Sequence, residues 1–284
     1  MISSRGGRVR PRVWCFTPNP VFEKKIDKKT GRCFCSKGGK GRNVARQLQQ
    51  WGIPTISVSV SSSSILGTDP GSDPKAGAGE RQGWAWVREG IERIDFFTED
   101  LKVGSMEWRK IREYWMRNLK SGDWWVVAGS SATGWSRGWW KKLIGDLQKK
   151  GVTVLVDSRG ALMREAVAAG AEWIKCNLTE AEETTGNKGF DRCIRNLTGN
   201  GTTGVVVTLG KEGLVAEVNG CRLCANAPRV KVKDPTGSGD VVTAALIYGE
   251  IRGWTTDKTL RIAAGVGAWK VSQGGDVAKV CLRD

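Results

Sequence analysis

A glycine-rich turn ahead of a largely apolar stretch is the sharpest chemical feature of the sequence. The turn covers residues 234–240 with the sequence Asp-Pro-Thr-Gly-Ser-Gly-Asp, and Val241–Leu246 follows directly. A helix that starts on such a turn directs several backbone N–H groups and the positive end of its dipole at one spot, which favours an anion such as phosphate. On the motif alone, an ordinary capped helix start explains the pattern equally well.

Asp240 is the carboxylate nearest to this turn. We expect the helix start to keep it ionised and able to accept a proton from a hydroxyl group beside a bound phosphoryl group. None of the 284 residues is a histidine, which excludes Ser-His-Asp and Cys-His nucleophiles, His-ligated catalytic zinc and an imidazole base. Proton transfer must therefore depend on a carboxylate, Lys, Cys or Tyr.

A second glycine cluster, Gly38-Gly39-Lys40-Gly41, also leads into a predicted helix and is rich in cations. It is not a P-loop, because no Ser or Thr follows a GxxxxGK pattern. The chain carries 45 Lys and Arg against 29 Asp and Glu, and 13 of these cations fall in residues 1–46. This basic region fits either a nucleic-acid-binding arm or a solvated tail followed by a site for an anionic small molecule. The first ten residues are short and lack aromatic residues, so specific nucleic-acid binding is the less favoured alternative, although weak attraction to polyanions at low salt is expected.

The elements that must position these groups alternate between short β-branched strands and amphipathic helices. Strands are expected at 13–17, 124–128, 152–156, 172–176 and 205–208, with helices at 136–149, 159–168, 178–185 and 190–197. Such alternation is typical of a parallel sheet covered by helices on both faces, a Rossmann-like layered domain. After Gly210 we expect an accessory β element at 213–218 and 222–233, then helices at 240–251 and 256–272. Residues 24–31 are expected to form a basic turn and 61–83 a loop.

The composition indicates a soluble, cytoplasmic protein. No apolar run reaches the roughly 18 residues that cross a bilayer, and the first twenty residues lack an apolar signal core. The eight cysteines are expected to be reduced thiols. Cys33 and Cys35 can form a zinc site with Cys221 and Cys224 only if the fold brings the pairs together, and their spacing is a weak zinc signal.

Seven segments, in this order, resemble the PfkB (ribokinase-like) carbohydrate kinases, most closely the branch containing 1-phosphofructokinase and tagatose-6-phosphate kinase. They are Thr17–Pro20, Gly38–Arg46, Gly129-Ser130 with Gly134, Asp157-Ser158 with Gly160, Lys175–Glu180, Thr208–Gly213 and Gly237–Asp240. The resemblance implies an α/β fold, a ribokinase-like Rossmann-type α/β/α sandwich with a small β lid. It implies one domain over residues 1–284, with a basic tail at about 1–10 and lid strands drawn from about 13–37 and 84–97.

The same resemblance implies roles for individual residues. Asp240 is expected to be the base that deprotonates the acceptor hydroxyl, while the N–H groups of Gly237, Ser238 and Gly239 stabilise the transferring phosphoryl group. Nucleotide binding is expected at Lys175, Asn177, Thr208, Gly210, Lys211 and Gly213. Asn177 and Glu180 match a motif associated with magnesium, which they are expected to hold through water. Sugar-phosphate binding is expected at Asn19, Glu23, Gly38, Gly39, Lys40, Asn43, Arg88 and Ser130.

The departures from the family pattern lie on the substrate side. Glu23 stands where the family has Asp, Arg88 is followed by Glu89-Gly90 where the family has x-Asn, and Ser61–Ser64 replaces a glycine pair. The stretch from Gly90 to Trp108 is short, which suggests a trimmed lid hairpin and leaves a homodimer through the lid as an open expectation.

The resemblance therefore implies ATP- and Mg²⁺-dependent phosphorylation of a phosphorylated ketohexose such as fructose 1-phosphate, fructose 6-phosphate or tagatose 6-phosphate. Lys40 and Arg88 would serve the phosphate that this substrate already carries. The alternatives are a kinase for an unphosphorylated sugar or nucleoside, a catalytically weak regulatory protein that binds nucleotide or sugar phosphate, and, least favoured, a nucleic-acid-binding protein. No membrane partner is expected.

Overall fold

The structure is a computed structural model. It describes residues 11–27, 33–60, 65–68, 81–87, 93–97, 99–199, 201–273 and 282. This description leaves out the side chains of residues 22–27, 33–37, 65–68, 81–87 and 93–97. The basic tail at 1–10, Ser61–Ser64, Arg88 and Gly90 also lie outside it.

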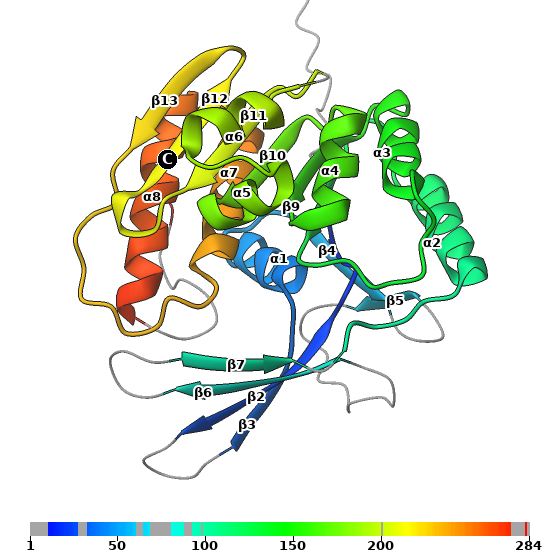
Figure 1. Ribbon diagram of the computed structural model, residues 1–284, viewed down its shortest axis with the longest axis horizontal. Coiled ribbons are helices and arrows are strands. Elements are labelled where there is room, and N and C mark those ends of the chain that lie inside the picture. The colour runs from blue at the N-terminus through cyan, green and yellow to red at the C-terminus, as the bar shows by residue number, and fades with distance from the viewer. Residues whose placement is uncertain are drawn as a thin grey trace, which may run out of the picture.

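A nine-stranded sheet forms the body of the molecule (Figure 1). Its order is β13-β12-β11-β10-β9-β8-β1-β4-β5, with parallel pairing from β4 through β11 and antiparallel strands at both edges. The central strands are short and buried, as parallel strands covered on both faces must be. The strands are β1 (Val13–Thr17), β4 (Thr55–Val60), β5 (Ile65–Thr68), β8 (Trp124–Ala128), β9 (Thr153–Asp157), β10 (Trp173–Asn177), β11 (Gly204–Thr208), β12 (Leu214–Val218) and β13 (Cys221–Ala225).

Two layers of helices cover this sheet. Helices α1, α7 and α8 bury one face, and α2 to α6 bury the other, so that successive residues of a strand enter different cores. In β8, for example, Trp125 belongs to one core and Val126 to the other. The helices are α1 (Lys40–Gln50), α2 (Ser105–Asn118), α3 (Trp139–Lys149), α4 (Gly160–Ala169), α5 (Leu178–Thr185), α6 (Phe190–Leu197), α7 (Ser238–Arg252) and α8 (Thr256–Gln273), and Gly210–Glu212 form a 3₁₀ turn, η1.

A separate four-stranded sheet projects from the body (Figure 1). It contains β2 (Val21–Asp27), β3 (Cys33–Gly38), β6 (Arg81–Val87) and β7 (Arg93–Phe97) in the order β3-β2-β6-β7. Two short connections attach it to the body: residues 18–20 lead from β1 to β2, and Gly39 leads from β3 to α1. The β2-β3 half of this sheet is therefore attached where β1 ends and α1 starts, and the chain returns to the sheet later with β6 and β7.

The expected fold class, an α/β/α sandwich with a small β lid, is confirmed. The expected strands and helices between residues 124 and 208 match the observed elements closely. Three local expectations are wrong. Residues 24–27 continue strand β2 because it pairs with both β3 and β6, and residues 65–68 and 81–83 are strands rather than loop. Cross-strand pairing overrides the charged or polar composition of these segments.

The third wrong expectation concerns the accessory strands. Strands β12 and β13 do not form a separate element but extend the nine-stranded sheet as antiparallel edge strands. The second of them ends at Ala225 rather than at 233, and Pro228, which has no N–H group, follows soon after. Strand β1, which lies inside the range expected for the lid, also belongs to the large sheet.

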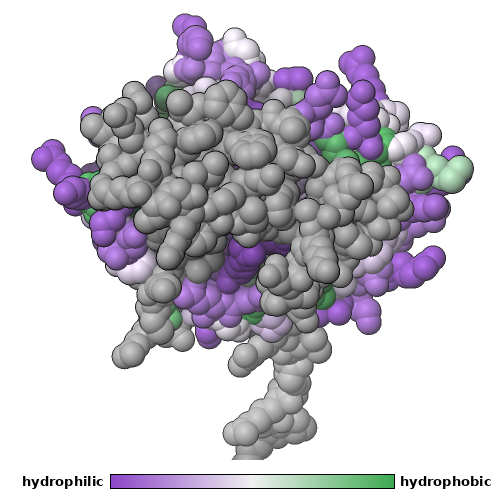
Figure 2. Space-filling model, turned by 90° about the horizontal axis from the view of Figure 1, so that it is seen from below, coloured by the Kyte–Doolittle hydropathy of each residue, from purple (hydrophilic) through white to green (hydrophobic). Residues whose placement is uncertain are grey.

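The cysteine pairs lie in different sheets. Cys33 and Cys35 are on β3 of the four-stranded sheet, whereas Cys221 and Cys224 are on edge strand β13 and are free, exposed thiols. Within the described ranges, no helix is long and apolar enough to span a bilayer. Viewed from the side of the four-stranded sheet, the described surface is mostly hydrophilic (Figure 2).

Candidate active site

Polar side chains gather at the carboxyl ends of β1, β9 and β10 and at the first turns of α1, α5 and α7. In open parallel sheets, ligands bind in the crevice beyond the carboxyl ends of the strands, next to the point where the strand order reverses. Here that point lies between β1 and β8, because the chain proceeds from β1 to β4 on one side and continues with β8 on the other. The groups described below lie at this end of the sheet.

The glycine-rich turn forms the start of α7. Gly237 is the N-cap in a left-handed conformation, with φ of 74°, and the first bond of the helix runs from Val241 N–H to its carbonyl. The N–H groups of Gly237, Gly239 and Asp240 donate to no acceptor in the described part of the chain. Ser238 differs from the expectation, because its N–H donates to the carbonyl of Pro235 at 3.3 Å. The turn therefore offers an anion the N–H groups of Gly237, Gly239 and Asp240.

Asp240 lies in the first turn of α7 and is 5% exposed. Its Oδ2 accepts a hydrogen bond of 2.7 Å from Nδ2 of Asn43, a residue of α1. Burial raises the pKa of the Asp240 carboxyl, and the nearby Lys40 ammonium and the Asn43 hydrogen bond oppose this only in part. That Asp240 is ionised and accepts a proton stays a prediction, and a raised pKa suits a group with this role.

An ion network beside Asp240 is buried at Asp157 and Lys175 and partly exposed at Lys40. The Asp157 carboxylate, at the end of β9, accepts from Lys175 Nζ at 3.0 Å and from Thr243 Oγ1 at 2.6 Å. Lys40 Nζ lies 3.4 Å from the other Asp157 oxygen and 3.0 Å from Glu180 Oε1. All five side chains converge from β9, β10, α1, α5 and α7, so the network connects the elements that surround the glycine-rich turn.

The charges of this network set the protonation states. Burial acts to raise the pKa of Asp157, but Lys175 and Lys40, helped by the Thr243 hydrogen bond, lower it overall. For Lys40, burial acts to lower the pKa, and the carboxylates of Asp157, Glu180 and Asp240 together raise it. The network therefore favours the charged forms of Asp157 and Lys40, whereas burial raises the pKa of Asp240.

The glycines at the start of α1 allow this helix to approach β1. A Cβ atom at Gly39 would lie 2.5 Å from Thr17 Cγ2, and one at Gly41 would lie 2.6 Å from the carbonyl oxygen of Phe16. Gly39 also has a φ of 119°, which favours glycine. The close approach places Lys40 and Asn43 within reach of the carboxylates on α5, β9 and α7.

The amide of Asn19 fixes the end of β1. Its Nδ2 donates to Asp100 Oδ1 at 2.8 Å and to Ser130 Oγ at 3.0 Å, and its Oδ1 accepts from the N–H of Leu101. The structure therefore brings together Asn19 and Ser130, two of the residues expected to bind the substrate. Asn19 also holds the segment that follows β7, through Asp100 and Leu101.

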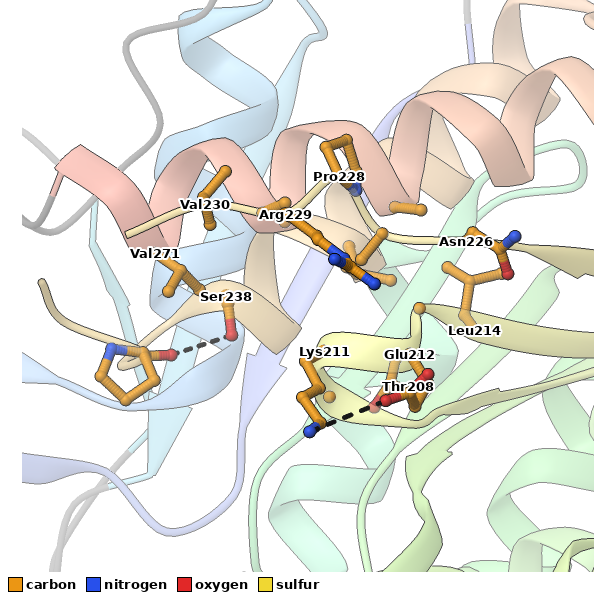
Figure 3. A pocket seen from close by; sticks show the side chains of 18 of the residues that line it. Thr208, Lys211, Glu212, Leu214, Asn226, Pro228, Arg229, Val230, Ser238 and Val271 are labelled. Carbon is orange, nitrogen blue, oxygen red and sulfur yellow. Dashed lines mark hydrogen bonds and ion pairs between the residues drawn. The ribbon is translucent and has the colours of Figure 1, made fainter. Parts of the chain in front are cut away.

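A cavity of about 840 Å³ lies between η1, the 226–232 segment and α8 (Figure 3). Its lining unites the expected nucleotide residues Thr208, Gly210, Lys211 and Gly213 with Ser238 and Gly239 of the glycine-rich turn. The volume lies within the usual range for pockets that hold small molecules. Lys211 and Arg229 come from opposite walls (Figure 3), and Lys211 pairs at 4.0 Å with Glu212, which also lines the cavity. Small residues of α8, Ala264, Gly267 and Ala268, form part of its apolar wall.

Asn177 and Glu180, the expected magnesium residues, form a capping box at the start of α5. Asn177 Oδ1 accepts from the N–H of Glu180, and Glu180 Oε2 accepts from the N–H of Asn177. Because Glu180 Oε1 also pairs with Lys40, both carboxylate oxygens already have partners. These oxygens therefore do not fit a divalent cation held directly, and contact with magnesium through water stays a prediction.

The remaining expected substrate residues are only partly described. Gly38 is buried at the end of β3, and Glu23 pairs in register with Ser36 and Gly83, but the Glu23 side chain lies outside the described residues. Arg88 lies outside them entirely. The sequence analysis gave no role to Asp157, Thr243 or Arg229. Asp157 follows a buried strand, and Arg229 begins an alternating basic segment, so both carried a usable signal.

Comparison with known proteins identifies the class to which this fold and site belong. Residues 75–281 match the sequence model of the family described as "pfkB family carbohydrate kinase". The chain belongs to this family, and it is a phosphotransferase of the carbohydrate kinase class.

Individual relatives are more distant. The tagatose-6-phosphate kinase of Staphylococcus epidermidis is 24% identical over 281 residues, which cover 91% of this chain and 89% of that protein. A tetrameric inhibited form of phosphofructokinase-2 from Escherichia coli shares 20% identity with a TM-score of 0.74, over 92% of this chain and 94% of that one. A fructose-, ADP- and calcium-bound fructokinase from Vibrio cholerae, 20% identical with a TM-score of 0.68, covers 94% of each chain. These structures support the fold.

Proposed function

We propose that this protein transfers the γ-phosphoryl group of ATP to a hydroxyl group of a phosphorylated ketohexose, such as fructose 1-phosphate, fructose 6-phosphate or tagatose 6-phosphate. The observation that carries the proposal is the position of Asp240. This buried carboxyl lies in the same helix turn as the N–H groups of Gly237 and Gly239, which have no acceptor in the described part of the chain, and that turn lines a cavity of about 840 Å³. A proton acceptor beside an anion site is what phosphoryl transfer to an alcohol requires.

Asp240 acts as the general base. Asn43 holds Oδ2 of the carboxylate at 2.7 Å, which leaves Oδ1 to accept the proton of the acceptor hydroxyl. The N–H groups of Gly237, Gly239 and Asp240 stabilise the charge on the transferring group, because preorganised donors need no rearrangement when that charge develops. No covalent intermediate on the protein is needed, which agrees with the lack of a histidine-activated nucleophile.

ATP is the proposed phosphoryl donor, and the 840 Å³ cavity is its proposed site. The expected nucleotide residues on η1 and the start of α7 lie on one side, and the small residues of α8 leave room for a planar base on the other. Lys175 Nζ would lie 3.0 Å from a Cβ atom at Gly239. Its positive charge therefore lies next to the glycine-rich turn, at the end of the cavity proposed for the phosphates. Mg²⁺ would neutralise phosphate charge when bound, and Asn177 and Glu180 would hold it through water.

The acceptor site is proposed at the ends of β1 and β8, where Asn19 and Ser130 meet, on the side of the body that carries the four-stranded sheet (Figure 1). Lys40 points at Asp157 and Glu180, which places its charge beside the reacting centre. Arg88 and other cations of the basic N-terminal third would then bind the phosphate that the sugar already carries. The names of the relatives, tagatose-6-phosphate kinase and phosphofructokinase-2, favour a phosphorylated ketohexose.

Two alternatives stay in the proposal. A kinase for an unphosphorylated sugar is favoured by the fructokinase of Vibrio cholerae, whose structure contains fructose. A weakly catalytic regulatory protein would need the nucleotide cavity but not the Asp240–Asn43 contact, and the 2.7 Å bond argues against it. A cytoplasmic location and a homodimer formed through the four-stranded sheet are further proposals.

One assay tests the function. ADP release is measured with ketohexose phosphates, free sugars and nucleosides for the natural protein, for Asp240→Asn and for Asp257→Asn, an exposed position on α8. We expect turnover of at least one sugar phosphate, a loss of about a hundredfold or more in kcat for Asp240→Asn, and no change for Asp257→Asn.

Equal rates for the natural protein and Asp240→Asn would refute the base assignment. ATP binding without turnover of any acceptor would favour the regulatory protein. Turnover of free sugars alone would assign the enzyme to the first alternative.

A further inference from the structure

A fully buried lysine lies behind the glycine-rich turn. Lys270, in the last turn of α8, is 0% exposed, and its Nζ donates to the carbonyl oxygen of Thr236 at 2.6 Å. Lysine is almost never fully buried without a partner, because its ammonium loses its hydration. The ammonium thus reaches a backbone atom of the turn itself. Neither the sequence analysis nor the phosphoryl-transfer chemistry described above uses this residue.

The helix that carries Lys270 is fixed against α7. A Cβ atom at Gly249 of α7 would lie 2.3 Å from Thr259 Oγ1, and one at Gly267 of α8 would lie 2.9 Å from Val242 Cγ2. Such close backbone approach leaves α8 little freedom to slide. The position of the Lys270 ammonium is therefore set by the packing of two helices rather than by a flexible loop.

The end of α8 holds the turn at a second point. The carbonyl of Val271, the next residue, accepts hydrogen bonds from the N–H groups of Lys233 and Asp234 at 2.9 and 3.1 Å. Lys270 and Val271 thus bind opposite ends of residues 233–236, one through a side-chain donor and one through a backbone acceptor. Within the turn, the Thr236 N–H donates to Asp234 Oδ1.

The Lys270 contact determines the direction of a proposed phosphate donor. In a planar trans peptide, the C=O of Thr236 and the N–H of Gly237 point in opposite directions, and no described peptide bond is cis. A cation that binds the carbonyl on the α8 side therefore turns the Gly237 N–H to the other side. Gly237 is the left-handed N-cap, with no Cβ atom to restrict its rotation, so the peptide needs such an external restraint.

We propose that Lys270 is a positioning residue of the phosphoryl-transfer site: a built-in cation that binds the Thr236 carbonyl and holds the Gly237 N–H toward the anion. It does not touch the substrate, and the proposal rests on the function proposed above. It implies that the enzyme needs no added monovalent cation at this turn, because the lysine ammonium already occupies the position where such an ion would meet the carbonyl.

The test compares Lys270→Met, which keeps the length of the side chain without its charge, with Lys270→Gln, which keeps a neutral donor. Lys258→Met, an exposed position on the same helix, is the matched control. Amide hydrogen exchange over residues 233–241 of the full chain is measured with and without ammonium chloride, with sodium chloride at equal ionic strength as the reference. We expect exchange in this segment to rise at least about tenfold in Lys270→Met and to return toward the natural rate with ammonium, a readout that does not depend on activity.

Kinetics supply the second readout. We expect kcat to fall about tenfold to a hundredfold in Lys270→Met with less change in the KM of the sugar, less loss in Lys270→Gln, and recovery by ammonium or potassium ions but not by sodium or tetramethylammonium. The natural protein and Lys258→Met should turn over equally in all four salts. If Lys270→Met does not fold, the salt comparison on the natural protein still tests the proposal, because a requirement for potassium or ammonium ions would contradict it.

Three results would overturn the proposal. The natural enzyme could require potassium or ammonium ions for activity, or amide exchange in residues 233–241 could be unchanged in Lys270→Met. In the third, no small cation restores the kcat that Lys270→Met has lost. The exchange measurement separates this proposal from the kinase assignment. A protein that turns over no acceptor but shows exchange rescued by ammonium would refute the function and leave the role of Lys270 intact.

Discussion

The two faces of the nine-stranded sheet are built from different residues. Under α2 to α6, four tryptophans are almost completely buried, Trp108, Trp115, Trp125 and Trp140, and their rings contact one another or Phe16. Under α1, α7 and α8, the buried residues are mainly Val, Ala, Leu and Ile, with glycines where the helices meet. Large aromatic rings fill much of the core on one face, whereas on the other face the helix backbones approach each other closely.

This difference explains where the chemistry lies. Along β9 and β10, Asp157 and Lys175 alternate with core residues of the aromatic face, so both point toward the face that α1 and α7 cover. Small residues let α1 and α7 approach closely enough for Asn43 and Asp240 to share a hydrogen bond. The aromatic face supplies buried area, and the small-residue face supplies the close helix contacts that position the polar groups of the site.

The largest expected effect tests the aromatic face. Trp115→Ala removes a fully buried ring that contacts Trp14, Phe16, Tyr114 and Trp125. We expect the free energy of unfolding to fall by about 3–5 kcal/mol, while kcat per folded molecule stays unchanged. Chemical denaturation and a rate normalised to folded protein measure the two quantities. A fall in kcat at equal folded concentration would show that the two faces are coupled.

The next effect tests the small-residue face. In Gly41→Ala, the new methyl group would lie 2.6 Å from the carbonyl oxygen of Phe16, so α1 must move. We expect a loss of about 1–3 kcal/mol in stability and about a hundredfold in kcat, because the helix carries Lys40 and Asn43.

Gly145→Ala is the matched control, in a helix of the aromatic face. A Cβ atom there meets nothing within 4 Å, and we expect about 0.5–1 kcal/mol of added stability with unchanged kcat. If Gly41→Ala leaves kcat unchanged, close approach of α1 does not position the site.

The sequence predicted the body of the molecule, on both faces of the nine-stranded sheet, better than the four-stranded sheet. Strand-helix alternation and the two glycine turns are local patterns, so the central strands and the turn at 237–240 could be placed from residues alone. The pairing of β2 with β6 joins segments distant in sequence, and the charged composition of residues 24–27 is not typical of a strand. Strand β2 could therefore not be predicted from local pattern. Asp157 and Lys270 were missed because their partners, Lys175, Lys40 and the Thr236 carbonyl, come from other elements.

The third prediction concerns the stability of the Asp240 carboxyl. Its pKa is raised in the folded state, so the folded protein binds this proton more tightly than the unfolded chain. The ionised carboxylate therefore costs stability at neutral pH, and that cost disappears as the pH falls through the folded pKa. We expect Asp240→Asn to unfold at a higher temperature than the natural protein at pH 7–8. The rise should be about 2–4 °C for each kcal/mol by which the free energy of unfolding increases.

The difference in unfolding temperature between the two proteins should shrink as the pH falls toward 4. Both proteins share Asp157, whose lowered pKa makes them lose stability together in acid as the pH falls through its folded value. The comparison at each pH therefore isolates Asp240. A difference that grows toward acid would mean that the folded state lowers the pKa of Asp240, and the proposed base would lose its physical basis.

The smallest expected effect separates two tryptophans of the aromatic face that touch each other. Trp14 Nε1 donates to Asp123 Oδ2 at 3.3 Å, whereas Trp115 Nε1 is buried and has no acceptor in the described part of the chain. Replacement by Phe shrinks either ring by a similar volume. In Trp115→Phe the loss of packing is offset by removal of an unsatisfied N–H, and in Trp14→Phe a hydrogen bond is lost as well. We expect Trp14→Phe to be less stable than Trp115→Phe by about 1 kcal/mol, measured by urea unfolding, with unchanged kcat in both. The reverse order would show that the Trp115 N–H is satisfied by the face of a neighbouring ring, and the aromatic face would then be held by directional contacts as well as by volume.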